Sequence, residues 1–239
     1  VETNSTLFTL LFTIFNVFIY RTTVQNDIIV GTPSADRNYT ETENNIGLFL
    51  NTLAIRSRVD NNQSFNGLLQ KIKSIFFDVL DNKDYPFEQL VEKLNPERDK
   101  SRNPLFSVLF QVLKKINTND NEKRLGNAKI NSIYAIESIG DFDIIMKAIE
   151  INNEQIALIC EYNTDLFEKE TIVGFLNMIK ELCKDISKNP DKKIQKLNVV
   201  TTKDRDKLAN LFNNTKIRYP KNKTIHQLFE EQVKRTPNK

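Results

Sequence analysis

The sequence predicts an α/β fold, an α+β sandwich in which helices flank a mixed sheet. Segments with apolar residues at helical spacing alternate with short apolar runs typical of buried strands, and the late strands include an antiparallel hairpin. The charge is nearly balanced, with 34 basic and 31 acidic side chains, and sixteen Phe are spread along the chain. This composition argues against intrinsic disorder, and 239 residues are enough for one large domain or two small ones.

The first predicted element is the most apolar segment, residues 7–20, with the sequence LFTLLFTIFNVFIY. The alternatives are a buried core helix and a signal or membrane span. The segment is short for a span, and Glu2 stands where a signal peptide would carry positive charge. Ser5 or Thr6 can cap a helix here by accepting hydrogen bonds from free N–H groups of its first turn. We therefore expect a core helix.

Two strands and two helices are expected next. The apolar run 27–30 predicts a buried strand closed by a turn at 31–33, which reads Gly-Thr-Pro. Residues 46–58 (IGLFLNTLAIRSR) predict a second strand, buried at positions 48–50 and alternating later. Residues 65–80 have clear helical spacing. Another helix is expected to start within 84–88, with Pro86 in its first turn, where a missing N–H costs nothing.

The second half of the chain is expected to be rich in strands. A hairpin turn is predicted at 151–154, between two of these strands. A long helix with apolar residues at helical spacing follows and ends at Asn189-Pro190. The predicted strands are 105–113, 129–136, 142–151 and 155–162, and the predicted helix is 168–186.

The usual catalytic constellations are nearly absent. The single histidine, His226, stands at the predicted first turn of an amphipathic helix near the end of the chain. No residue cluster has the ligand spacing of a zinc site, and no glycine-rich nucleotide-binding motif occurs. Asp141 and Asp143 would share one side of a strand, either as a metal or acid–base pair or, the reading we favour, as a solvated strand edge.

Three stretches mix turn formers, aromatic residues and charges: 46–56 (IGLFLNTLAIR), 82–88 (NKDYPFE) and 98–105 (RDKSRNPL). Asn51 and Thr52 are polar residues in an otherwise apolar strand. Such groups need hydrogen-bond partners when buried, or they face a cavity where a ligand supplies them. Arg98 and Arg102 come just before a strand and can form a hydrogen-bonded corner, because a guanidinium bridges several acceptors at once. A purely structural role is the alternative for both clusters.

These three stretches resemble the last three signature motifs of condensation domains from nonribosomal peptide synthetases, in the family's order. Gly31-Thr32-Pro33 followed by Arg37 resembles a further family segment, although Asp36 replaces its second glycine. Leu50 stands where the family more often has Val. Residues 162–167 resemble the stretch before the family's final helix, and residues 220–239 resemble the opening of an adenylation domain. The resemblance covers almost the whole chain.

The resemblance implies a chloramphenicol-acetyltransferase-like lobe. A full condensation domain has two such lobes with a tunnel between them, and two carrier proteins deliver thioester-linked substrates to it on phosphopantetheine arms. The acceptor's amine attacks the donor's thioester and an amide forms. The family's His-His-x-x-x-Asp-Gly motif belongs to the first lobe and does not occur here. The chain is therefore expected to be the second lobe only, a fragment of an amide-forming acyltransferase that is inactive alone.

The resemblance also carries over site residues. The candidates for the substrate tunnel are Arg37, Gly47, Asn51 and Thr52, of which Asn51 is expected to hydrogen-bond an oxyanion or the phosphopantetheine arm. Gly47 would permit close backbone approach. A mainly structural role is expected for the other motif positions: Tyr85, Pro86, Phe87, Arg98, Asp99, Arg102, Asn103 and Pro104.

The predicted organisation has three parts. Residues 1–188 are the C-terminal lobe, 189–223 an interdomain linker, and 224–239 the first helix of a truncated adenylation domain. The distribution of charge supports a division of the chain into two units. Residues from Asp191 onward hold thirteen basic and five acidic side chains, whereas the preceding part is mildly acidic. The cations are spaced among apolar residues, which argues against a nucleic-acid-binding arm.

Expected partners are the donor and acceptor peptidyl carrier proteins, together with the N-terminal condensation lobe and the adenylation domain of the same polypeptide. No nucleic acid and no membrane are expected. No directly bound cofactor or metal is expected, and phosphopantetheine enters only on the carrier proteins. Cys160 and Cys183 lack metal-ligand spacing and fit a reducing, cytoplasmic compartment. Plentiful Asn, Lys and Ile, which have AT-rich codons, suggest a bacterial source, and the resemblance implies a role in peptide antibiotic biosynthesis. An isolated lobe is also expected to expose an apolar face and self-associate.

Two alternatives remain open. The chain is either a catalytic half or a non-catalytic module that binds carrier proteins and organises an assembly line. Within the catalytic class, the related epimerisation domain shares the fold. Residues 98–105 and the adenylation-like continuation argue against epimerisation.

Overall fold

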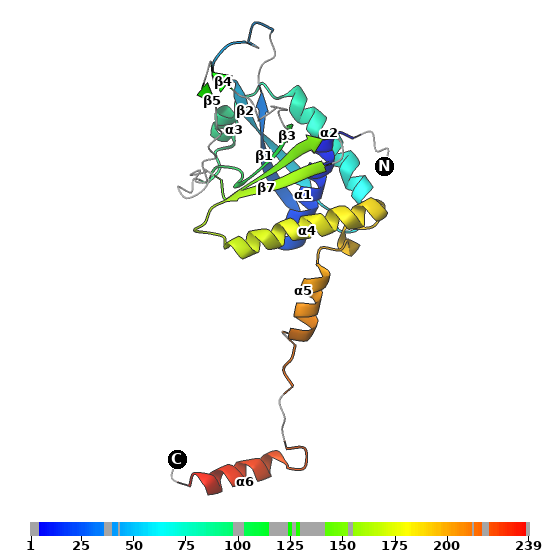
Figure 1. Cartoon of the computed structure of the whole chain (residues 1–239), viewed down its shortest axis with the longest axis vertical. Helices are drawn as coiled ribbons and strands as arrows, with labels where there is room; N and C mark the ends of the chain where they lie inside the picture. The colour runs from blue at the N-terminus through cyan, green and yellow to red at the C-terminus, as the bar shows by residue number, and fades with distance from the viewer. Residues whose placement is uncertain are drawn as a thin grey trace. The chain divides into compact units, whose positions relative to one another are not determined.

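The structure is a computed structural model that describes residues 5–35, 40–42, 44–97, 103–114, 124–125, 128–129, 142–152, 155–211, 213–216 and 220–237. It divides into two compact units, 1–199 and 200–239. The larger unit contains a five-stranded mixed sheet in the order β2-β1-β3-β6-β7 (Figure 1). Its strands are β1 (Asp27–Ala35), β2 (Leu50–Arg58), β3 (Val108–Lys114), β6 (Ile144–Asn152) and β7 (Gln155–Tyr162).

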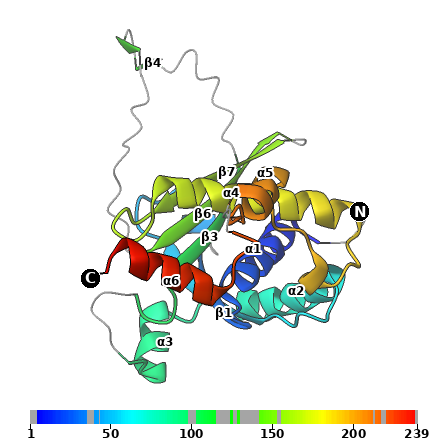
Figure 2. The ribbon, with the colours of Figure 1, turned by 90° about the horizontal axis from the view of Figure 1, so that it is seen from below.

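Three long helices pack on one face of this sheet: α1 (Leu7–Thr23), α2 (Phe65–Asp81) and α4 (Lys169–Lys188). Figures 1 and 2 show them in one layer, with α1 between α2 and α4. The remaining elements of the larger unit are α3 (Phe87–Leu94) and the short pieces η1 (Thr40–Thr42), β4 (Arg124–Leu125), β5 (Ala128–Lys129) and η2 (Ile194–Lys196). The smaller unit contains α5 (Thr202–Asp206), η3 (Lys207–Leu211) and α6 (Ile225–Arg235).

The core lies between the sheet and the helix layer. Phe110 of β3 is 2% exposed, and its ring centroid lies 5.7 Å from that of Phe12 and 5.3 Å from that of Phe15, both on α1. The predicted core helix is therefore confirmed, with the side chain of Thr6 accepting a hydrogen bond from the Thr9 N–H at its start. Within the described residues, no helix combines the length and apolarity needed to cross a membrane.

The polar residues of α1 do not disturb this core, because they are hydrogen-bonded inside it. Asn16 is fully buried; its amide donates to the Phe12 carbonyl at 2.8 Å and accepts from the Ser57 hydroxyl at 2.6 Å. This bond links α1 to β2 across the interface between helices and sheet.

The predicted turn at 31–33 is wrong. β1 continues through these residues to Ala35, and β2 pairs with it over its whole length, from Asp27↔Arg58 to Ala35↔Leu50. This non-local pairing overrides the local turn tendency of Gly-Thr-Pro. On its other side, β1 pairs with β3 only at Gly31↔Leu109, so Pro33 lies beyond that ladder.

The predicted burial of positions 48–50 is also wrong. β2 begins at Leu50, and Leu48 and Leu50 are 86% and 61% exposed. The buried positions of the strand are Leu53, Ile55 and Ser57, which alternate on the face toward the helices.

Two other predicted strands also differ. β3 starts at Val108 rather than 105, because Leu105 has a left-handed backbone with φ 72°, outside the β region. Of the strand predicted at 129–136, Lys129 belongs to the short β5 and the rest lies outside the described residues.

Candidate functional site

Several sequence motifs meet at one end of the sheet. Ser34 and Pro33 of β1 pair with Asn51 and Thr52 of β2, so the Gly31-Thr32-Pro33 segment and the stretch 46–56 lie on adjacent strands. Asn51 also connects β2 to the stretch 82–88. Its amide nitrogen donates to the carbonyl oxygens of Lys83 at 2.6 Å and Tyr85 at 3.0 Å, and its carbonyl accepts from the Thr52 N–H at 2.9 Å.

This geometry gives Asn51 a bracing role. Its two amide hydrogens have two acceptors within the chain, both in the loop that precedes α3. Pro86 is the N-cap residue of α3, so Asn51 fixes the direction in which that helix starts. The arrangement favours a positioning role over the expected contact with an oxyanion, and the tunnel assignment of Asn51 and Thr52 stays a prediction.

Phe106, which directly follows the stretch 98–105, joins the same place through aromatic rings. Phe106 is 5% exposed and its ring lies 5.5 Å from that of Phe87 on α3 and 5.8 Å from the stacked ring of Phe142. The same ring covers Gly31, where an added Cβ would come within 2.0 Å of the Phe106 Cε2 atom. Gly31 is therefore required by close approach rather than by a turn.

A broad groove of about 1510 Å³ opens beside this cluster. It is lined by the first residues of β1 and β3, by α3 and by the segment before β3. Asn51 and Thr52 pair with the opposite end of β1 and do not line it. Three of the predicted motif residues line it: Phe87, Asn103 and Pro104. Sequence reasoning missed Asp27, Glu92 and Phe106, which also line it. Glu88 and Leu105 line it too; they stand in the stretches 82–88 and 98–105 but were not among the candidate site residues.

The charge in this groove includes one strongly perturbed carboxylate. Arg56 donates to both carboxylate oxygens of Asp27, at 2.8 and 2.7 Å, and Arg58 approaches at 3.3 Å. The hydrogen bond from Arg56 outweighs desolvation and, with the charges of both arginines, lowers the pKa of Asp27 to about 2. Asp27 is thus a fixed anion and not a proton-transfer group near neutral pH.

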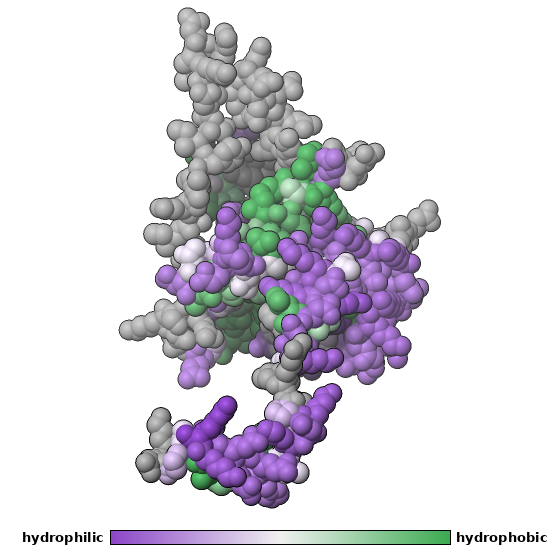
Figure 3. All heavy atoms as spheres, turned by 60° about the horizontal axis from the view of Figure 1, so that its bottom comes forward, coloured by the Kyte–Doolittle hydropathy of each residue, from purple (hydrophilic) through white to green (hydrophobic). Residues whose placement is uncertain are grey.

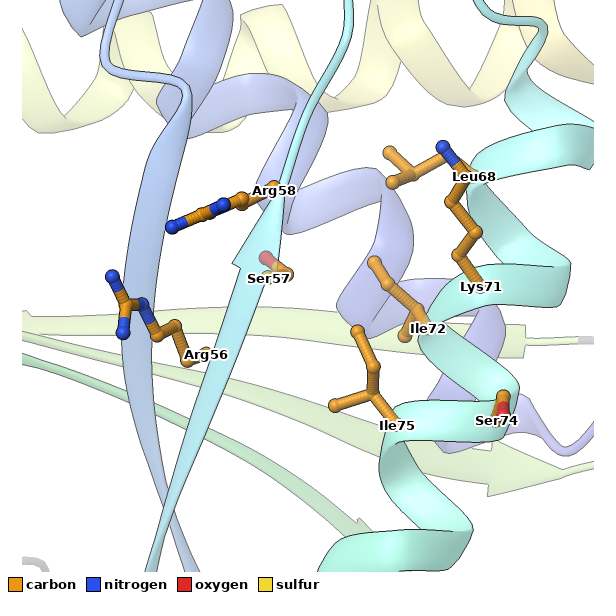
Figure 4. A pocket seen from close by; sticks show the side chains of 8 residues that line it. All are labelled: Arg56, Ser57, Arg58, Leu68, Lys71, Ile72, Ser74 and Ile75. Atoms are coloured by element: carbon orange, nitrogen blue, oxygen red, sulfur yellow. The ribbon is translucent and has the colours of Figure 1, made fainter.

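A second pocket, of about 480 Å³, lies between β2 and α2 (Figure 4). Leu68, Ile72 and Ile75 point from α2 toward the strand, whereas Arg56 and Arg58 extend away from the helix. None of the predicted site residues that the structure describes lines this pocket. It offers apolar walls and no evident chemistry.

The remaining predicted residues are placed as follows. Gly47 is exposed in the segment before β2, and Tyr85 is 44% exposed. Arg37, Arg98, Asp99, Arg102 and Asp141 lie outside the described residues. His226 lies in the first turn of α6, in the smaller unit.

Nucleophilic or metal chemistry has no support in the described part of the chain. Burial and the charge of Glu161 raise the pKa of Cys160 to about 11, and burial raises the pKa of Cys183, so both thiols stay protonated. Within the described residues, no group of three or more His, Cys, Asp and Glu side chains is arranged to hold a metal ion.

A sequence model described as "Condensation domain" matches residues 1–209. The chain belongs to the condensation-domain family. Gramicidin S synthase 2 of Brevibacillus brevis is 38% identical over 99% of this chain, and bacitracin synthase 1 of Bacillus licheniformis is 36% identical over 98%. This chain spans only 5% and 4% of the lengths of these two relatives.

Solved structures share the fold of the condensation domain. The holo form of AB3403, a four-domain nonribosomal peptide synthetase bound to AMP and glycine, superposes with a TM-score of 0.71 and 22% identity, over 84% of this chain and 16% of that one. The condensation domain of the Monacolin K polyketide synthase MokA gives a TM-score of 0.69 and 19% identity, over 81% of this chain and 44% of that one. The predicted fold class, a mixed sheet flanked by helices, is confirmed.

Proposed function

We propose that this condensation-family chain is the C-terminal lobe of a nonribosomal peptide synthetase condensation domain. In this proposal it forms one wall of the site where two carrier-bound thioesters condense. The observation that carries the proposal is the linkage between the family-like segments. Asn51 of β2 bonds the loop before α3, and the ring of Phe106 packs on Phe87 of α3 and over Gly31 of β1. Of these residues, Phe87 and Phe106 line the groove. The matched condensation domain of MokA, of which this chain covers 44%, supports a reading as one of two lobes.

The reaction requires a nucleophilic amine and a thiol leaving group. The acceptor's amine nitrogen attacks the donor's thioester carbonyl carbon, a C–N bond forms, and the C–S bond breaks. The amine loses one proton and the departing phosphopantetheine thiolate gains one. This chain supplies no histidine in its larger unit to assist that transfer, since His226 is its single histidine. We infer that an N-terminal lobe supplies it and that this chain alone is inactive.

The contribution of this chain is then positioning. Asn51 holds the loop before α3, and Phe106 holds α3 and the segment before β3 against the sheet. Both act on groove walls rather than on reacting atoms. A misplacement of about 1 Å far from the reacting atoms can cost roughly a hundredfold in rate, so these contacts can affect the rate without touching substrate.

The partners follow from the same proposal. Donor and acceptor carrier proteins bring the phosphopantetheine arms, which are part of the substrates and not a cofactor of this chain. Residues 224–239 begin an adenylation domain, and the expected linker at 189–223 precedes them. The compact larger unit extends beyond the predicted end of the lobe at 188, to Val199.

The test is reconstitution from two pieces. The chain is mixed with a separately made N-terminal condensation lobe carrying the His-His-x-x-x-Asp-Gly motif, plus aminoacyl-loaded donor and acceptor carrier proteins, and the dipeptidyl thioester is measured by mass spectrometry. We expect product only when both lobes are present. Asn51→Asp, which keeps the oxygen but removes both donors, should lower the rate about ten- to a hundredfold. Asn177→Ala, an exposed asparagine on α4, is the matched control and should not change it.

Two results would favour other functions, and a third would contradict the two-lobe proposal. Carrier binding without product from any added lobe would favour a scaffold module. A donor thioester that is racemised but not transferred would favour an epimerisation domain. Product from this chain alone would contradict the need for a second lobe.

A further inference from the structure

The segment 190–199, which follows α4, is packed against the larger unit; we call it the strap. The sequence places it in the predicted linker. In the structure Ile194 is fully buried, and Leu197 and Val199 are 2% and 8% exposed. These apolar side chains are inside the larger unit, which ends at Val199.

Arg21, in the last turn of α1, holds the strap by its backbone. One nitrogen of its guanidinium, Nη1, lies 2.7 Å from the Leu197 carbonyl oxygen, 3.0 Å from that of Ile194 and 3.3 Å from that of Gln195. These three carbonyls are in and after the short turn η2, and the Ile194 carbonyl also accepts from the Leu197 N–H at 3.2 Å. A single cationic side chain therefore gathers the acceptors of a whole turn.

The start of α2 holds the other side of the strap. The Phe65 N–H donates to the Lys192 carbonyl, and the Ile194 N–H donates to the Gln63 carbonyl at 3.0 Å, so a short antiparallel ladder forms. The amide of Asn66 also donates to the carboxylate of Asp191 at 2.8 Å.

A third attachment lies at the end of α4. The carboxylate of Asp185 accepts from the Lys192 ammonium at 2.7 Å and from the Asn198 N–H at 2.8 Å. The strap thus joins the ends of all three helices in the layer.

The interface between the strap and the rest of the larger unit also contains unpaired polar atoms. Gln63 Nε2 and Asn66 Oδ1, on residues that bond the strap, are buried without a hydrogen-bond partner among the described residues. Such atoms weaken an interface relative to a fully satisfied core. The strap is therefore expected to open locally, while the sheet stays folded.

We propose that Arg21 is the lock of this strap: its hydrogen bonds keep the strap packed on the larger unit. The connection to the next unit then starts at Val200 rather than at 189. Loss of the guanidinium leaves three carbonyls without their shared donor and releases the segment from the lobe. All three contacts come from one nitrogen, Nη1, so a lysine ammonium, which has three donors, can keep part of the attachment on its shorter side chain. The inference stands independently of the proposed function.

Trypsin tests the lock on the full chain, because the strap contains Lys192, Lys193 and Lys196. In the wild type these sites should resist cleavage, while Lys203, Arg205 and Lys207 in the smaller unit are cut first and serve as internal references. In Arg21→Ala we expect strap cleavage at least about tenfold faster, with reference sites unchanged. Arg21→Lys should fall between Arg21→Ala and the wild type, because its shorter side chain keeps only part of the contacts, and the control Arg58→Ala should match the wild type.

Hydrogen exchange separates a local release from general unfolding. The strap amides, such as that of Ile194, should lose protection in Arg21→Ala, whereas those of the β6–β7 ladder should keep it. Unchanged strap cleavage in Arg21→Ala would overturn the proposal. So would an equal loss of protection across β6 and β7, since Arg21 would then stabilise the whole unit rather than lock the strap.

Discussion

The ring of Phe106 packs directly on the backbone of Gly31, and this contact requires that residue 31 has no side chain. A Cβ on residue 31 would lie 2.0 and 2.5 Å from two ring atoms of Phe106. Gly31→Ala should therefore force the ring aside and destabilise the unit by about 1–3 kcal/mol, the usual cost of overpacking. Urea unfolding measures this loss.

The matched control for that prediction is a double-mutant cycle. Phe106→Ala removes the clash as well as the ring, so the effects of the two substitutions should not add, and Gly31→Ala should cost little in the Phe106→Ala background. Additive effects would show that the ring is not what excludes a side chain at position 31.

At the same scale, the sequence predicted the identity of the motif residues better than their roles. Asn51 was recognisable as a polar residue in an apolar strand, which requires a partner. Its partners lie 32 and 34 positions away, in a loop whose approach depends on the fold. Gly31 carried a usable signal, because a glycine within a strand pattern indicates close backbone approach, but the neighbouring Pro33 favoured a turn.

Elements with uninterrupted periodicity were predicted well. The predicted helix 65–80 corresponds to α2 at Phe65–Asp81, and the predicted strand 155–162 matches β7. The predictions failed where contacts between residues far apart in the sequence determine the local structure. β1 runs through Gly31 and Pro33 because β2 pairs along it, and the strap packs because Arg21, 173 positions from Ile194, reaches it.

Acid should loosen the strap through Asp185. Desolvation raises the pKa of this carboxyl, but the hydrogen bonds from Lys192 and the Asn198 N–H, with the charges of Lys192 and Lys188, lower it on balance. The folded state therefore favours the carboxylate. Its contribution to stability is fully present above the unfolded pKa of about 3.9 and is lost as pH falls through the lower folded value.

Thermal melts of Asp185→Asn against the wild type measure this effect. The wild type should melt higher at neutral pH, and the gap should shrink below about pH 4, where the unfolded carboxyl takes up its proton. Asp206→Asn, in the smaller unit, should show no such trend. A gap that stays constant down to pH 2 would mean that the charge of Asp185 does not hold the strap.

At the scale of the whole molecule, the sheet has two unlike faces. The helices cover the face that carries Phe110, Met146 and Ala148, all nearly or fully buried. Alternate residues point to the opposite face, and they include Leu113 and Ile159, which are 41% and 42% exposed. Figure 3 shows a large hydrophobic area on the larger unit.

This opposite face also carries an ion pair. Lys147 lies opposite Ile159 in the β6–β7 register, and its ammonium is 2.5 Å from the carboxylate of Glu161. The pair is half-buried, with side chains 23% and 38% exposed. A mixed surface of aliphatic residues around a polar pair is typical of an interface, and a second lobe in the proposed function would cover it.

Without such a cover, the isolated chain should self-associate through this face. Sedimentation velocity over about a hundredfold range of concentration should show a rising weight-average mass. Ile159→Lys places a charge among the aliphatic residues and should shift the chain toward monomer. Val173→Lys, at a position on α4 that is 48% exposed, adds the same charge to the helix layer and should not. A monomer at every concentration would contradict this prediction and would remove the exposed face as support for a second lobe.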